Sequence, residues 1–247
     1  MIFTIAYKEL RMLFLSPLAW ILLAFSQVVL TWVFLGRLDA FLEIQPQLMQ
    51  IANPPGVTEI IISPVFAIAA IVLLMVTPLL TMRLVAEERR NHTLALLISA
   101  PISITAIILG KFLSLLVFFC IVIGLILGLC ISLLAGGTLD FGLLLSCAVG
   151  LFLLAACYAA LGLYVSSLTD QPVIAAIGAL SVLLGFWIMD LMASDTDGWM
   201  LYFSLFKHFE QFNYGLIDSF SIVYFVLFMF FFLAITIRQM AGERVQV

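Results

Sequence analysis

The chain has 247 residues, of which 65% are hydrophobic and only 10% are charged. A soluble domain is about half apolar and a quarter charged, so this composition excludes an ordinary soluble protein. The formal net charge is −4 and no basic patch is present, which argues against a nucleic-acid partner. The apolar residues gather in runs of about 20, the length of a helix that crosses a bilayer. We therefore predict an all-α membrane protein with six transmembrane helices.

The first segment, 2–15, mixes charged and apolar residues. Its apolar side chains, including Leu10, approximate one helical face, whereas Lys8, Glu9 and Arg11 fall largely off that face. This pattern predicts a helix that lies in the membrane interface. The alternative is a flank that merely extends the first membrane span.

Six apolar runs follow and form one transmembrane domain over 1–247. The expected spans are about 18–35, 65–82, 112–135, 142–166, 173–190 and 220–237. Long polar loops are expected at 36–64 and 191–218, on one side of the membrane, and a charged loop at 83–111 on the other.

Lysine and arginine are distributed unevenly between these two sides. Eight of the ten lie on the side of the termini and of the 83–111 loop, leaving Arg37 and Lys207 opposite. The positive-inside rule then places both termini and the 83–111 loop in the cytoplasm. It makes 36–64 and 191–218 extracytoplasmic loops.

The 83–111 loop contains the main concentration of charge, with four consecutive ionisable residues, Glu87, Glu88, Arg89 and Arg90. Inserting all four at the centre of a bilayer would cost about 10–14 kcal/mol. The loop must therefore lie outside the hydrocarbon. We interpret it as the contact surface for a cytoplasmic partner; the alternative is a solvated anchor that merely obeys the positive-inside rule.

The residues that follow predict a rigid elbow. Thr93 can cap a short helix through its hydroxyl. Leu96 and Leu97 give that helix an apolar contact surface, and Pro101 ends it, because proline removes a donor and clashes with the preceding turn. The elbow would display the charged run together with His92.

Small residues recur every four positions in the third span, at Gly124, Gly128, Ser132 and Gly136. Such a stripe lets helix backbones approach closely. It predicts a packing contact, either with another subunit or within the chain, and the sequence does not decide between them.

Aromatic residues at helical spacing mark the 191–218 loop, among them Tyr202, Phe206, Phe209 and Phe212. They predict an amphipathic helix in the outer membrane interface, where aromatic side chains concentrate, with a re-entrant helix as the alternative. Such a helix could form a passive belt or the lip of a substrate exit.

The spans contain almost no ionisable residue, and Asp170 and Asp190 lie at predicted helix ends. Ion-coupled carriers usually need buried charged relay groups, so a secondary carrier is disfavoured. The chain has no H-E-x-x-H, no G-x-S-x-G and no Walker lysine, so no catalytic residue, cofactor site or metal site is expected in it. The four cysteines lie in apolar runs, without the spacing of a metal site.

Three stretches resemble ABC-2-type permeases, the membrane subunits of ABC transporters. They are AEERRNHTLALLISAPIS with the later LGK, the opening YKELRMLFLSPLAWI, and YFSLFKHFEQFNYGLIDSFSIVYF at 202–225. The last two are similar to the gliding-motility-like branch. The resemblance implies a type V exporter-like fold, a homo- or heterodimer of permeases, and separate cytoplasmic ATPase subunits that bind ATP and Mg. It also implies that the loop after the second helix couples to the ATPase.

These features together predict an exporter-type permease subunit in a bacterial inner membrane, surrounded by membrane lipids. The substrate and any extracytoplasmic accessory protein stay open. One alternative is a related subunit that transmits force or assembles an extracytoplasmic machine without moving a solute. A second is an ATP-independent secondary carrier.

Overall fold

A computed structural model describes residues 1–48, 56–91, 103–135, 139–192 and 204–244, and every regular element within these ranges is helical. Six helical stretches are long and apolar enough to cross a membrane, which confirms the expected class. The elements are α1 (Ile2–Leu15), α2 (Pro17–Leu48), the π-helical η1 (Thr58–Ile62), α3 (Ser63–Leu84), α4 (Ala86–Arg90), α6 (Ile104–Ile131), the 3₁₀ turn η2 (Ser132–Ala135), α7 (Phe141–Ser167), α8 (Pro172–Met192), α10 (Leu205–Asn213) and α11 (Ser219–Arg244).

Helices α3 and α7 form the centre of the bundle. In their spanning windows 67% and 72% of the residues are buried, against 22% in both α8 and α11. A β-carbon on Gly162 of α7 would lie 2.5 Å from Thr81 Oγ1, so the two central helices meet where α7 has no side chain. The outer helices leave large apolar side chains exposed, as a helix that faces lipid does.

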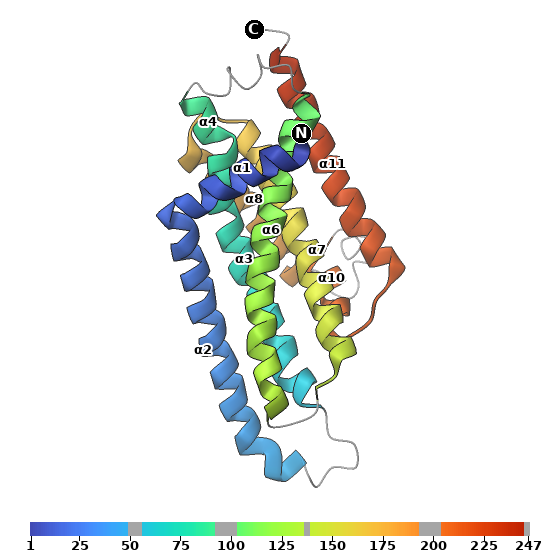
Figure 1. Cartoon of the computed structure of the whole chain (residues 1–247). Helices are drawn as coiled ribbons and strands as arrows, with labels where there is room; N and C mark the ends of the chain where they lie inside the picture. The colour runs from blue at the N-terminus through green and yellow to red at the C-terminus, as the bar shows by residue number, and fades with distance from the viewer. Residues whose placement is uncertain (49–55, 92–102, 136–138, 193–203, 245–247) are drawn as a thin grey trace.

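The helix α1 lies across the end of the bundle where α4, the N-terminus and the last turns of α11 are also found (Figure 1). A β-carbon on Gly110 of α6 would lie 2.7 Å from Ile5 Cγ2, so α1 packs closely over the start of α6. The chain turns into α2 at Ser16, whose backbone is extended. At this corner Trp20 Nε1 donates to the carbonyl oxygen of Phe14 at 2.9 Å, and the two rings meet edge to face.

The helices extend beyond the expected spans at both ends of the bundle. The helix α2 continues to Leu48, and helical structure resumes at η1, so much of the expected 36–64 loop is helical instead. Polar residues such as Arg37 and Glu43 are exposed, and a helix can carry them once it leaves the hydrocarbon. At the other end α6 begins at Ile104, eight residues before the expected start at 112, with the Ser103 side chain accepting from the amide of Ala106 as its N-cap.

Candidate functional site

The helix α4 follows directly on the central helix α3, after a break in the helical backbone at Val85. Its sequence AEERR has acidic residues in the first turn and basic residues in the last, the arrangement that suits the helix dipole. The amide of Ala86 donates to Ser166 Oγ on α7 at 3.1 Å, so the first turn of α4 is fixed to the core.

A buried ion cluster joins α4 to α6 and α1. Lys111 of α6 is fully buried, and its ammonium lies 2.7 Å from Glu88 Oε1 and 3.2 Å from Glu9 Oε1. Glu9 itself is buried, and the exposed Lys8 ammonium lies 3.6 Å from the same carboxylate oxygen. We call Lys111, Glu9 and Glu88 the Lys111 cluster.

Counting Lys8, two cations and two carboxylates meet in the Lys111 cluster, so its formal charges balance. Taking charges out of water is costly, and close opposite charges offset that cost only with good geometry. The 2.7 Å contact between Lys111 and Glu88 is at the short end for a charge-assisted hydrogen bond. The cluster therefore holds α4, α6 and α1 in one relative arrangement, since moving one of them would separate buried charges.

A second set of contacts joins α4 to the turn between α7 and α8. The Arg89 side chain donates to the carbonyl oxygen of Ser167 at 2.9 Å, and its Nε lies 3.1 Å from Asp170 Oδ1. Just before α4, Arg83 in the last turn of α3 donates to Ser16 Oγ at the α1–α2 corner at 2.6 Å. Through these contacts α4 is linked to α1, α6, α7 and α8.

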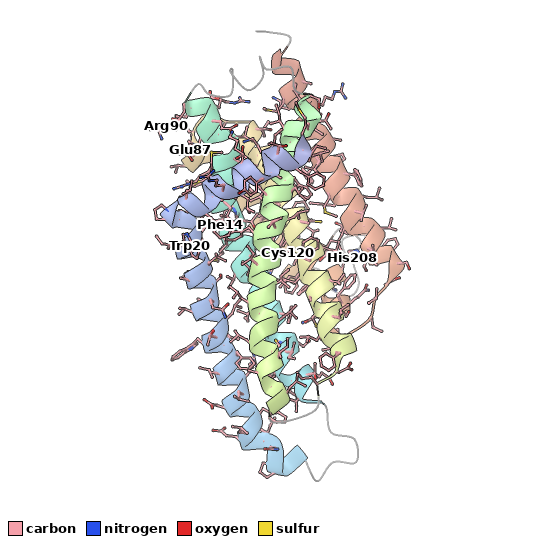
Figure 2. All side chains as sticks on the ribbon, viewed as in Figure 1. Phe14, Trp20, Glu87, Arg90, Cys120 and His208 are labelled. Atoms are coloured by element: carbon pink, nitrogen blue, oxygen red, sulfur yellow. The ribbon has the colours of Figure 1, made fainter. Side chains whose placement is uncertain are left out.

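The four predicted charged residues of α4 fall into two pairs. Arg90 is exposed, and Glu87 is half exposed with its carboxylate 3.9 Å from Arg83 of α3; Figure 2 labels both at the α4 end of the bundle. Glu88 and Arg89 instead turn inward, with side-chain exposures of 17% and 20%. The expectation that all four are displayed was wrong for this inner pair, because Lys111 on α6 attracts Glu88, and the Ser167 carbonyl oxygen and Asp170 attract Arg89.

In the N-terminal helix the expectation was wrong for Glu9. It was placed off the apolar face, but it is 3% exposed and faces Lys111. Lys8 and Arg11 are exposed and Leu10 is partly buried. The remaining predicted coupling residues, His92, Thr93, Leu96, Leu97 and Pro101, lie outside the described residues.

Sequence reasoning missed Lys111 as a site residue, because the expected third span began one position after it. The signal was present, however: Lys111 follows a run of apolar residues that begins at Ile104 and precedes another. A single cation within such a run needs a buried anion, and Glu9 and Glu88 were available at the same end of the molecule.

The small-residue stripe of α6 faces outward. Gly124, Gly128 and Ser132 are exposed, and nothing lies within 4 Å of a β-carbon built on either glycine. The stripe is therefore no contact within the chain, at least over these three residues. Gly136 lies outside the described residues.

The expected amphipathic helix of the second long loop exists as α10, but most of its apolar face is buried in the protein while Glu210 and Gln211 are exposed. Phe209 and Phe212 are fully buried. A β-carbon on Gly150 of α7 would lie 2.5 Å from Phe212 Cβ, so α10 packs tightly onto α7. The placement in the outer interface was wrong for these two residues, because the aromatic face of α10 packs into the protein instead. Phe206 is only partly buried, and Tyr202 lies outside the described residues.

Hydrogen bonds fix the end of α10 as well. Asn213 Nδ2 donates to the carbonyl oxygen of Ser63 at 2.9 Å, and Ser63 Oγ donates back to the carbonyl oxygen of Asn213 at 2.7 Å. Ser146 Oγ on α7 donates to the carbonyl oxygen of Phe212 at 2.9 Å. The polar end of α10 is thus satisfied inside the bundle.

Comparison with known families places the chain in one of them. A sequence model whose description reads ABC-2 family transporter protein matches residues 3–237, nearly the whole chain. No curated protein sequence matches the chain. The matched region includes α1, α4 and the Lys111 cluster, and it ends within α11.

Proposed function

The chain belongs to the ABC-2 family of transporter proteins, and we propose that it is the permease subunit of an ABC exporter, driven by separate cytoplasmic ATPase subunits. The partner subunits bind ATP and Mg, and this chain supplies the path through the membrane. The branch resembling gliding-motility permeases is part of the proposal, on the strength of the stretches 7–21 and 202–225.

The observation that carries the proposal is the double-sided character of α4. Its outer side presents Glu87 and Arg90 to a partner, while its inner side is fixed through Glu88 to the buried Lys111 and through Arg89 to the Ser167 carbonyl oxygen and Asp170. A segment that only anchored the chain would need no such inner contacts, because solvated charges alone obey the positive-inside rule. A segment that transmits movement from a soluble ATPase to the transmembrane helices needs contacts with both of them.

The contacts of α4 also suggest how this movement is transmitted. The ATPase would push on the outer side of α4 as ATP binds and is hydrolysed. The Lys111 cluster would pass that movement to α6 and α1, and Arg89 would pass it to the α7–α8 turn through Ser167 and Asp170. Because these links are short and charged, the helices would rock together.

The rest of the assembly follows the same proposal. The subunit pairs with a second permease, identical or related, and the pathway opens between the two. The cation-rich end, with α4 and both termini, faces the cytoplasm of a bacterium and the chain crosses the inner membrane. Export is proposed from the resemblance to exporter-type permeases.

Gentle purification of the complex, followed by identification of the copurifying proteins, tests this function. We expect an ATP-hydrolysing subunit in stoichiometric amount, and hydrolysis that depends on the permease. Copurification of an ATPase together with an extracytoplasmic assembly and no transported solute would favour the force-transmitting alternative. Transport by the chain alone in proteoliposomes, driven by an ion gradient, would contradict the proposal.

A further inference from the structure

A groove lies on the outer surface of the bundle between α2 and α3. Its volume is about 350 Å³. The α2 positions that line it recur at i, i+1, i+4, i+5 and i+8, so they form one strip along the helix. The lining residues are Trp32, Val33, Gly36, Arg37 and Ala40 of α2 and Ile68 of α3.

Gly36 creates the hollow in this strip. Nothing lies within 4 Å of a β-carbon built on Gly36, so the missing side chain leaves open space. Trp32 stands one turn away with 79% of its surface exposed, and Ile68 supplies an apolar wall from α3. The result is an apolar slot with one cationic end at Arg37.

Arg37 has no anionic partner within the described part of the chain. It is exposed and forms none of the ion pairs or side-chain hydrogen bonds found there. The acidic residues nearest in sequence, Asp39 and Glu43, are two and six positions away and not at the i+3 or i+4 spacing that brings side chains together. A guanidinium has five donors in a fixed fork, which suits a phosphate.

The position of the groove across the membrane matches the level of the lipid headgroups. Arg37 lies 20 positions after Pro17, the first residue of α2, which corresponds to roughly 30 Å along a helix. That length equals the hydrocarbon thickness of a typical bilayer, so Arg37 lies at the headgroup level opposite α4. Trp32 is just inside this level, where tryptophan is enriched.

We propose that this groove binds one anionic phospholipid from the leaflet opposite α4. Its phosphate pairs with the Arg37 guanidinium, and the first part of an acyl chain lies in the slot over Gly36, between Trp32 and Ile68. The slot favours an amphiphile over a soluble anion, because its walls are apolar and only one end is charged. The site is independent of the proposed ATPase coupling.

Native mass spectrometry of the delipidated complex, titrated with phosphatidylglycerol, tests the proposal. Gly36→Leu fills the slot and leaves the charge in place, whereas Arg37→Gln removes the charge and leaves the slot. Both positions are open, so neither change disturbs packing. We expect each variant to weaken binding of one lipid by about tenfold or more. Arg37→Gln loses a charge-assisted hydrogen bond, and Gly36→Leu places its side chain where the acyl chain would lie.

Two matched controls and two further ligands complete the test. Gly185→Leu places the same side chain at another open glycine, and Lys207→Gln removes another cation outside the α4 end; both should bind as the wild type does. Inorganic phosphate should not displace the lipid, and phosphatidylcholine should bind more weakly.

Wild-type affinity in Gly36→Leu and Arg37→Gln would overturn the site. Displacement by inorganic phosphate would overturn a lipid as its occupant, and equal binding of phosphatidylcholine would overturn the anionic preference.

Discussion

The Lys111 ammonium lies 2.7 Å from Glu88 Oε1, in a part of the protein where the lysine side chain is only 1% exposed. The two residues belong to different helices and are 23 positions apart in the chain. The contact fixes α4 against the first turns of a membrane-spanning helix. It makes the charged segment part of the transmembrane structure and not an appendage to it.

Replacing Lys111 by methionine should destabilise the folded chain by about 3–5 kcal/mol, because Glu9 and Glu88 would lose a buried counter-charge. The measurement is unfolding of the purified protein in detergent. Lys8→Met is the matched control: its side chain is 53% exposed, and the change should cost about 1 kcal/mol or less. Equal effects of the two changes would mean that the Lys111 cluster contributes no more than an exposed pair.

Gly162→Ala should destabilise the bundle, because its β-carbon would lie 2.5 Å from Thr81 Oγ1 at the contact between α3 and α7. Overpacking of this kind costs about 1–3 kcal/mol. Gly124→Ala on α6 meets open space and should be neutral or stabilising, since alanine favours a helix over glycine. The midpoint of thermal unfolding should therefore fall in Gly162→Ala and stay the same or rise in Gly124→Ala. A lowered midpoint in Gly124→Ala would reveal a contact with another subunit.

Sequence reasoning predicted the helical class and the six spans, because long apolar runs have few alternatives in a bilayer. It did not predict the inward orientation of Glu9, since the residue's neighbours Lys8 and Arg11 are exposed and local periodicity suggested the same for it. The partner that draws Glu9 inward is Lys111, which lies 102 positions away. Contacts of that separation are set by helix packing and not by local pattern.

The burial of α10 was not predicted for the same reason, because it depends on contacts between distant parts of the chain. Its aromatic spacing correctly indicated a helix with one apolar face, but an apolar face can pack against lipid or against protein. Gly150 on α7 decides between them, because its missing side chain leaves room for Phe212. That relationship between two distant positions is not visible in the periodicity of either segment.

The orientation of the chain in the membrane can be tested with single cysteines in a chain whose four native cysteines are replaced. Arg90→Cys lies at the α4 end, while Glu43→Cys and Asp218→Cys introduce exposed thiols that we expect on the opposite side. An impermeant thiol reagent applied to intact cells should label positions 43 and 218 but not 90. Labelling at position 90 alone would mean that the chain has the opposite orientation in the membrane.

Charge reversal on α4 should separate its two sides functionally. Glu87→Lys and Arg90→Glu change the outer side and should lower permease-dependent ATP hydrolysis. They should change stability by no more than about 1 kcal/mol, because Arg90 is exposed and the pair of Glu87 with Arg83, at 3.9 Å, is half exposed. Glu88→Lys should instead lower stability, since it places two like charges next to each other at Lys111. ATPase assays and unfolding of the same preparations distinguish these outcomes. Loss of stability in the outer variants would contradict the assignment of sides.

The most direct test of ATPase coupling through α4 is photo-crosslinking from position 90 in the intact complex. A photoreactive amino acid in place of Arg90 should crosslink to an ATP-hydrolysing subunit, and the extent of crosslinking should change when ATP is added. The same residue in place of Glu43, exposed on α2 near the opposite end of the bundle, should give no such product. Absence of the ATPase product from position 90, or an equal yield from position 43, would contradict docking through α4.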